Sequence, residues 1–312
     1  MIDSGTSELT RLGVVLVNHH GEDLIRDRVA LLTSWGAEVV VVDNSSTYDG
    51  PGTVVDSGAN LGFGRACNLG VQQLPPHIDA VCFHNPDVEI DEAGLRALHA
   101  RLRSQTSPGV VAPGIRTGMS HRPAGFRYPS FSRQSAIVIV GAVRARRARR
   151  RGRDLPREDR AGSSNTRGRR FGSGACLIVD RSAFESVGGF DEHYFLYAED
   201  LAIWDSLRRA GFDIGFAPDV TVLHHRGTGG RASNTRRELL RWAGVEYFLS
   251  TRVPRRARLL RFVHRTALRT FAFGDPVLAT RLDELWRAGA PPAEVLDEIA
   301  AQLARTSDDR RD

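Results

Sequence analysis

Lysine, cysteine and long apolar runs are scarce in this sequence of 312 residues. Lysine is absent, so all 43 basic side chains are arginines, and with 37 acidic side chains the net charge is +6. The three cysteines, Cys67, Cys82 and Cys176, stand far apart among apolar neighbours. Their spacing excludes a disulfide framework and a cysteine-rich zinc site, and it predicts buried, reduced thiols in a cytoplasmic protein.

No apolar run approaches the roughly 20 residues of a membrane-spanning helix. The longest run, residues 136–143, is far too short. Residues 1–5 have neither the basic start nor the apolar stretch of a signal peptide. We therefore expect a cytoplasmic protein that has at most a peripheral contact with the inner face of the plasma membrane.

The arginines gather in two clusters, at residues 144–153 and between Arg252 and Arg269. An arginine-only composition is typical of a GC-rich genome, but such clusters also bind nucleic acid, anionic lipid or phosphorylated substrates. Residues 144–170 lack apolar periodicity and predict a mobile basic loop. In the second cluster, arginines recur at helical spacing, which is typical of a basic amphipathic helix on an anionic membrane. A tail that packs on the core with solvated arginines explains the second pattern almost as well.

Segments of strand type and helix type alternate over the first hundred residues. Short apolar runs predict strands at 13–17, 39–42, 53–55, 79–83 and 110–112. Helical periodicity predicts helices at 25–32, 64–74 and 91–104. This alternation is typical of an α/β fold with a mostly parallel, Rossmann-like sheet flanked by helices.

The second half predicts strands at 174–179, 214–216 and 220–222, and helices at 181–187 and 199–209. From residue 235 onward the pattern is helical. We therefore expect a catalytic domain of residues 1–232 and a C-terminal helical extension of residues 233–312.

Polar residues follow three of the predicted strands: Asn18 after the first, Asp43 after the second and Asp87 after the fourth. Open α/β sheets bind ligands at the carboxyl ends of their strands. A single aspartate there is usually a turn former or a helix cap, but three polar residues in register favour a ligand site. The carboxylate of Asp43 is suited to accept hydrogen bonds from a nucleotide base or ribose. The carboxylate of Asp87 is suited to bind a divalent cation, which in turn holds a diphosphate.

Two adjacent carboxylates, Glu199 and Asp200, begin the predicted helix after an aromatic-rich segment. A carboxylate in surroundings of low polarity is suited to act as a general base. Further on, His224 and His225 follow a strand and precede a glycine-rich stretch. A neutral imidazole suits Mn²⁺, although a hydrogen-bonded surface pair of histidines explains the motif equally well.

The glycine-rich segment at residues 58–70 weakly suggests a dinucleotide fingerprint. Its spacing is wrong for that motif, and it follows the third strand instead of the first, so we reject a dehydrogenase. Arg65, in the first turn of the helix that follows, either faces a phosphate or is a solvated arginine.

Taken together, these segments resemble the inverting GT-A glycosyltransferases of family 2, in particular the rhamnosyltransferase-like branch that acts on bacterial cell-envelope glycans. The resemblance spans roughly residues 12–250 and rests on motifs that occur in the family order. These motifs lie at residues 14–18, 41–46, 60–70, 85–90, 174–179, 187–192, 195–200 and 222–225. The implied fold is of GT-A type.

The resemblance implies a role for ten residues. Those implied to bind the nucleotide sugar are Asn18, Asp43, Asn60, Arg65 and Asp87. Those implied to bind Mn²⁺ or Mg²⁺ are Asp87 and His224, and those implied to act in catalysis are Asp200, as general base, and Glu199. Those implied to bind the acceptor are Gly174 and Trp204.

The implied reaction moves a sugar, rhamnose-like by preference, from a dTDP- or UDP-linked donor to a glycan or polyprenyl-linked acceptor. One departure is Ala202, which stands where the family commonly has a second acidic residue. Helical geometry turns position 202 away from Asp200, so the base survives and acceptor recognition is affected.

Two other classes remain. A nucleotidyltransferase needs a glycine-rich phosphate loop near the first strand, and residues 18–21 are not one. A non-catalytic protein that binds nucleotides, glycans or polyanions explains the arginines but not the carboxylates at strand and helix ends. We expect no specific binding of nucleic acid.

Overall fold

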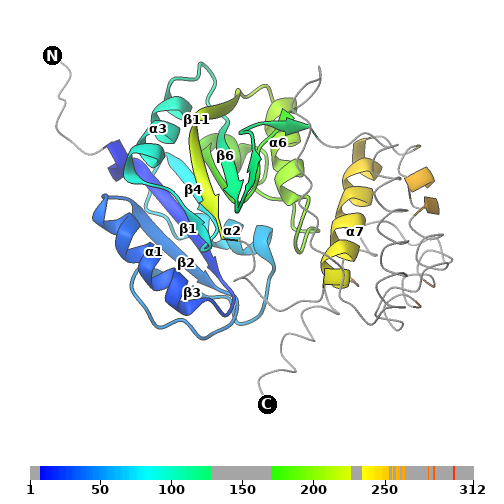
Figure 1. Cartoon of the computed structure of the whole chain (residues 1–312), viewed down its shortest axis with the longest axis horizontal. Coiled ribbons are helices and arrows are strands. Elements are labelled where there is room, and N and C mark those ends of the chain that lie inside the picture. Colours follow the sequence, from blue (N-terminus) through cyan, green and yellow to red (C-terminus); the bar gives the residue numbers. More distant parts are fainter. Residues whose placement is uncertain are drawn as a thin grey trace. The chain divides into compact units, whose positions relative to one another are not determined.

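The computed structural model describes residues 8–127, 170–225 and 234–252, together with single residues and short pieces between 255 and 298. It contains two compact units. The first unit holds the described residues 8–127, 170–192 and 199–225, and the second holds 193–198 and the described residues from 234 onward (Figure 1). The predicted basic loop and most of the predicted basic tail lie outside the described residues.

The first unit begins with the expected alternation of strands and helices. The 3₁₀ turn η1 spans Glu8–Arg11. The strands are β1 (Leu12–Asn18), β2 (Glu38–Asp43), β3 (Thr53–Asp56), β4 (Ala80–His84), β5 (Val88–Glu89) and β6 (Val110–Thr117). The helices are α1 (Glu22–Ser34), α2 (Phe63–Gln72) and α3 (Glu92–Arg103).

The later elements complete the first unit and contribute a helix to the second. The strands are β7 (Ser120–Arg122), β8 (Phe126–Arg127), β9 (Arg170–Phe171), β10 (Cys176–Asp180) and β11 (Ile214–His224). The helices are α5 (Arg181–Ser186), α6 (Glu199–Arg209) and α7 (Asn234–Arg252).

The main sheet has the strand order β3-β2-β1-β4-β10-β6-β11-β5, with β7 paired to β6. The strands β1, β2, β3, β4, β6 and β11 run in one direction, because β10 is antiparallel to both of its neighbours, β4 and β6. The sheet is therefore mixed, and most of its strands are parallel, as expected. The ends of β1, β2, β4, β6 and β11 form one edge, which we call the carboxyl edge.

The two strands predicted at 214–216 and 220–222 are one strand, β11. Its register against β6 shifts between Ala217 and Thr221. Pro218 lies within this irregularity, and proline has no N–H to donate to a ladder. The apolar pattern breaks at this bulge, which is why the sequence reads as two strands.

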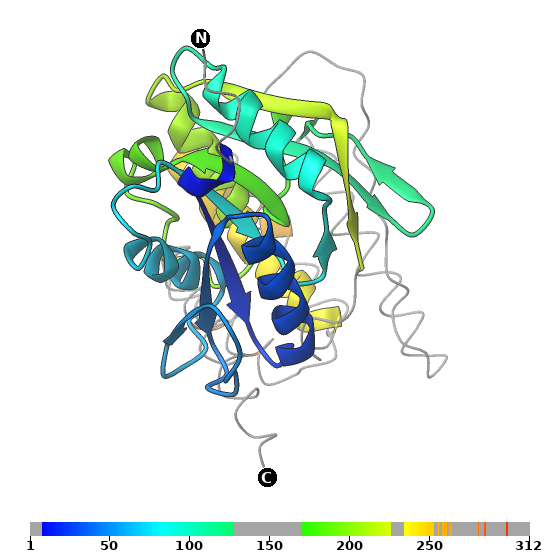
Figure 2. The ribbon, with the colours of Figure 1, turned by 90° about the vertical axis from the view of Figure 1, so that its left-hand side faces the viewer.

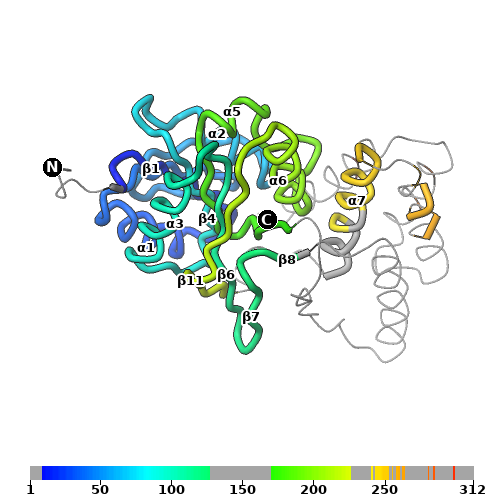
Figure 3. The backbone as a smooth tube through the Cα atoms, turned by 90° about the horizontal axis from the view of Figure 1, so that it is seen from above, coloured from blue at the N-terminus to red at the C-terminus, as the bar shows by residue number. Residues whose placement is uncertain are grey.

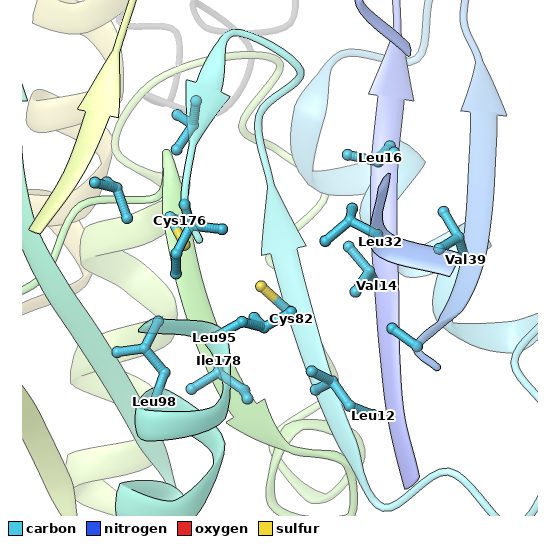
Figure 4. Packing of buried hydrophobic residues seen from close by; sticks show 14 of the residues in the cluster. Leu12, Val14, Leu16, Leu32, Val39, Cys82, Leu95, Leu98, Cys176 and Ile178 are labelled. Carbon is cyan, nitrogen blue, oxygen red and sulfur yellow. The ribbon is translucent and has the colours of Figure 1, made fainter. Parts of the chain in front are cut away.

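Helices cover both faces of the sheet. The side chains of Leu12, Val14 and Leu16 pack with those of α1 and α3 in one buried cluster (Figure 4). Figure 2 shows α1 and α3 on this face of the strands. The alternate residue Val15 points the other way, toward α2, where a Cβ at Gly70 would lie only 2.6 Å from Val15 Cγ1. Glycine at position 70 thus permits α2 to pack closely on β1.

In the second unit, the aromatic segment His193–Ala198 packs on α7. The rings of Tyr194 and Tyr247 lie edge to face with centroids 5.0 Å apart, and the guanidinium of Arg241 lies 4.7 Å from the ring centroid of Tyr197. A Cβ at Gly244 would lie 2.7 Å from the carbonyl oxygen of Tyr197, so only glycine permits this approach. Among the described residues, no helix has both the length and the apolar content to cross a membrane.

Candidate active site

The carboxyl edge of β2 carries a buried carboxylate that orders the loop after it. Asp43 is 1% exposed. Its Oδ1 accepts hydrogen bonds from the backbone N–H and hydroxyl of Ser45, and its Oδ2 accepts from the N–H groups of Thr47 and Tyr48 at 2.6 Å. Burial by itself raises the pKa of Asp43, but these hydrogen bonds outweigh it and hold the pKa below its ordinary value.

Asn18, at the end of β1, belongs to the same network. Its side-chain amide donates to Asp43 at 2.9 Å and to the hydroxyl of Ser45 at 3.1 Å. The side-chain Oδ1 of Asn18 accepts from the N–H of Gly21 at 3.0 Å, just before α1. Asn18 is fully buried, so it ties the loops after β1 and β2 together.

The loop before α2 brings a third segment to this edge. The side-chain amide nitrogen of Asn60 lies 2.9 Å from the ring nitrogen Nε2 of His19, and the side-chain Oδ1 of Asn60 accepts from the N–H of Gly62 at 3.1 Å. Asn44 donates to the carbonyl oxygen of Gly62 at 2.9 Å. These contacts place Asn60 and His19 beside the Asp43 loop.

Arg65, exposed in the first turn of α2, contacts the loop before α6. Its Nε donates to the carbonyl oxygen of Glu192 at 2.7 Å. One turn later, Asn68 bonds both the N–H and the carbonyl oxygen of Phe190 at 2.9 Å. The guanidinium is thus held on the segment that leads toward Glu199.

Two histidine–carboxylate pairs join β5 and its preceding loop to the end of β11. Nε2 of His224 lies 3.2 Å from Oδ1 of Asp87, and both side chains are less than a fifth exposed. Nε2 of His225 lies 2.8 Å from Oε1 of Glu89, in a half-exposed position. The N–H of His225 also donates to the carbonyl oxygen of Asp87 at 2.8 Å. Asp87 and His224, far apart in the sequence, are therefore brought together.

Behind this pair lies a histidine that the sequence interpretation missed. His84, the last residue of β4, is fully buried. Burial and then the positive charge of Arg28 lower the pKa of His84 to about 3, so its imidazole is neutral. It adds no charge to the Asp87–His224 pair. Its apolar neighbours along β4 gave no sign of a polar position.

Asp200, at the start of α6, is held by two backbone donors. The N–H of Gly174 donates to Oδ2 at 3.1 Å, and the N–H of Leu201 donates to Oδ1 at 2.8 Å. A Cβ on Gly174 would lie 3.0 Å from the Cβ of Asp200. Gly174 therefore positions this carboxylate. Just before it, Tyr197 and Ala198 have φ values of 73° and 74°, a strained left-handed backbone.

Glu199, next to Asp200, is in a different environment. It is 6% exposed, and its Oε2 has no hydrogen-bond partner among the described residues. Burial, followed by the charge of Asp200, raises the pKa of Glu199 to about 8. At neutral pH Glu199 therefore holds a proton.

A family model for "Glycosyltransferase like family 2" matches residues 95–244. An N-acetylglucosaminyl-diphospho-decaprenol L-rhamnosyltransferase of Mycobacterium tuberculosis is 34% identical over 227 residues, which cover 64% of this chain and 69% of the relative. The chain belongs to glycosyltransferase family 2. A second relative of this glycosyltransferase, a hexosyltransferase of low-salt glycan biosynthesis from Haloferax volcanii, is 26% identical over 70% of this chain and 68% of its own length.

The fold of this glycosyltransferase is similar to that of a solved GT-A type enzyme. The mannosyltransferase PcManGT of Pyrobaculum calidifontis, in complex with GDP-Man and Mn²⁺, matches with a TM-score of 0.51 and 17% identity. The match covers 94% of this chain and 80% of the mannosyltransferase. The expectation of a GT-A fold and of glycosyltransferase activity is thus confirmed.

Three of the predicted contact residues, Asn18, Asp43 and Trp204, are buried. The polar groups of Asn18 and Asp43 form hydrogen bonds within the loops after β1 and β2, and their contact with a nucleotide stays a prediction. Trp204 is fully buried and stacks on Phe216 with ring centroids 5.4 Å apart. The contact of Trp204 with an acceptor stays a prediction.

Proposed function

We propose that this glycosyltransferase transfers a rhamnose-type sugar from a nucleoside diphosphate donor to a polyprenyl-diphosphate-linked glycan, with inversion. The mycobacterial relative is named for the transfer of L-rhamnose to N-acetylglucosaminyl-diphospho-decaprenol. The observation that carries the catalytic part is Asp200, a carboxylate fixed by the N–H groups of Gly174 and Leu201 beside a protonated Glu199.

Asp200 acts as the general base in this proposal. Its two backbone donors fix the direction of the carboxylate. It takes the proton from the acceptor hydroxyl as that oxygen attacks the anomeric carbon, from the side opposite the departing diphosphate. A positioned base contributes typically 10²–10⁴-fold to a rate. Because Glu199 keeps its proton, only one of the two adjacent carboxyl groups competes for the proton of the acceptor.

A divalent cation fits the pair formed by Asp87 and His224. One carboxylate oxygen and one imidazole nitrogen face each other, a donor set that suits Mn²⁺. When bound, such an ion stabilises the negative charge that develops on the leaving diphosphate. Among the described residues, no third histidine, cysteine or acidic side chain is grouped with them. Arg65 adds a positive charge on the α2 side.

The loop after β2, which Asp43 orders through hydrogen bonds, forms the donor side of the proposed site. With Asn18 and Asp43 engaged beneath it, this loop presents Ser46 and Thr47 at the surface. A nucleotide that contacts the loop meets a preformed surface and therefore loses little affinity to ordering of the protein. Asn60 and His19 lie on the neighbouring segment and complete this proposed nucleotide site.

The first test is thermal stabilisation of the full chain by dTDP, UDP and GDP, each with and without Mn²⁺ or Mg²⁺. A metal-dependent rise in Tm with one nucleotide supports the proposed site and identifies the donor class. The absence of a shift with every nucleotide, in folded protein, would contradict it.

The second test addresses the base. Transfer of the sugar is followed with the donor so identified and an N-acetylglucosaminyl-diphospho-polyprenol. Asp200→Asn should lower kcat at least 10²-fold and leave the nucleotide-induced rise in Tm unchanged. Asp219→Asn, at a half-exposed carboxylate on β11, is the matched control and should transfer like the unmodified protein. Undiminished transfer by Asp200→Asn would refute the assignment.

A further inference from the structure

The β6–β7 hairpin extends the sheet at the carboxyl edge. β6 pairs with β10 only at Val110 and Val111, and it then continues beside β11 as far as Thr117. Arg116 is in register with Leu223, so Thr117 is level with His224. The turn at the tip therefore lies on the order of 7 Å beyond His224 along the strand direction. Figures 2 and 3 show this hairpin extending from the sheet of the first unit.

The tip of the hairpin exposes a large apolar side chain. Thr117 pairs with Ser120 across a two-residue turn of Gly118 and Met119. The φ of Gly118 is +53°, which suits the first central position of a type II′ turn. Met119 is 105% exposed, more than any other large hydrophobic residue that the structure describes. An apolar side chain at this position buries no surface in the folded monomer and so does not stabilise it.

The hairpin itself carries charge of one sign. Residues 110–127 contain no aspartate or glutamate. Arg116 and His121 are exposed on the two strands of the hairpin, and Arg122 lies over the ring of Phe126, 5.0 Å from its centroid. A single flexible apolar side chain between basic groups matches the headgroup region of an anionic bilayer, where arginines meet phosphates and an apolar tip reaches the acyl boundary.

A protein partner fits this surface less well. Stable protein interfaces bury on the order of 800 Å² on each side, with an apolar centre of several residues. The hairpin offers one apolar side chain on a narrow turn. A membrane surface needs no such area, because each arginine near anionic lipid adds its own attraction.

We propose that the β6–β7 hairpin contacts the membrane, with Met119 inserted among the headgroups of an anionic leaflet and the carboxyl edge turned toward the bilayer. This inference rests on the proposed function in one respect, since a polyprenyl-linked acceptor lies at that surface. It assigns the contact to a described element of the sheet, separate from the arginine-rich tail.

A fluorophore at position 119 tests the insertion. The three native cysteines are buried, so Met119→Cys adds one accessible thiol for an environment-sensitive label. Gln73→Cys is the matched control, because Gln73 is exposed after α2, toward the opposite edge of the sheet. With vesicles of phosphatidylcholine and phosphatidylglycerol, the label at 119 should shift to the blue, and the label at 73 should not. Vesicle binding without a shift at 119, or no binding at all, would overturn the proposal.

Charge substitutions test the electrostatic part. Arg116→Gln and Thr10→Glu each lower the net charge by one, but Thr10 lies exposed in η1, before the start of β1. Arg116→Gln should weaken partition into the anionic vesicles about fivefold, and Thr10→Glu should have a much smaller effect. Equal effects of the two would show that only total charge matters, and would refute the hairpin contact.

Transfer assays separate this inference from the proposed function. With a short-chain, water-soluble acceptor analogue, Arg116→Gln should react like the unmodified protein, whereas with acceptor in anionic vesicles it should react more slowly. If no protein transfers sugar in either format, the proposed function fails. If Arg116→Gln transfers sugar as fast as the unmodified protein both with the soluble acceptor and with acceptor in vesicles, only the hairpin proposal fails.

Discussion

Replacing Glu199 by glutamine should stabilise the protein, and increasingly so as the pH rises. Glu199 is buried beside Asp200, and its pKa in the folded chain is raised from 4.5 to about 8. Glutamine has nearly the same shape and carries no charge at any pH. The substitution therefore removes the titration and leaves the packing near Gly64 and Phe190 largely intact.

The sign follows from proton linkage. Between pH 4.5 and about 8 the unfolded chain has lost the proton at this position, but the folded chain still holds it. The free energy of unfolding falls over this range, by about 1.4 kcal/mol for each pH unit from this one group. Below pH 4.5 Glu199 is protonated in both the folded and the unfolded chain, and it no longer lowers the free energy of unfolding. Above pH 8 its destabilising effect is constant. At pH 7 the gain from Glu199→Gln is about 3 kcal/mol as an upper value.

Urea unfolding of both proteins at pH 5, 6, 7 and 8 measures this gain directly. We expect a small difference at pH 5 and a difference of a few kcal/mol at pH 8. Glu185→Gln, at an exposed residue of α5, is the control and should change stability little at any of these pH values. A gain that is equal at all four pH values, or that grows toward acid, would refute the protonated state of Glu199.

The remaining predictions concern positioning and the cation. Gly174→Ala should lower kcat about tenfold with little change in nucleotide-induced Tm, because its Cβ would press on Asp200 at 3.0 Å; unchanged kcat would contradict the positioning role. Asp43→Ala should cost about 3 kcal/mol or more of stability in urea unfolding, since the N–H groups of Thr47 and Tyr48 lose their acceptor, and it should weaken nucleotide binding in calorimetry. Asp87→Asn should abolish the Mn²⁺-dependent part of the nucleotide-induced rise in Tm, whereas an undiminished Mn²⁺ effect would place the ion elsewhere.

The sequence predicts the local elements of this fold well. Period-two and period-3.6 patterns depend on neighbours along the chain, and β1, β2, β4, α1 and α3 all appear close to the expected positions. The family motifs also lead to the correct enzyme class. What the patterns miss is pairing between distant segments: nothing in residues 174–179 shows that β10 runs antiparallel between β4 and β6.

In the candidate site, too, the local sequence shows some features and the tertiary contacts decide others. Residue types and their places at strand ends are enough to select Asp43, Asp87, Asp200 and His224 from the sequence. Their roles depend on which donors reach them. Asp43 is saturated by its own loop, and Asp200 is held by a glycine 26 residues away.

Thus the sequence alone determined the secondary structure, the family and the set of chemically capable residues. Only the tertiary structure decided that Glu199 is buried and protonated, that Trp204 lies in the core, and that Met119 stands exposed at the carboxyl edge. The physical reason is that burial and hydrogen-bond saturation are set by atoms distant in the chain, and a local pattern of residue types carries little information about them.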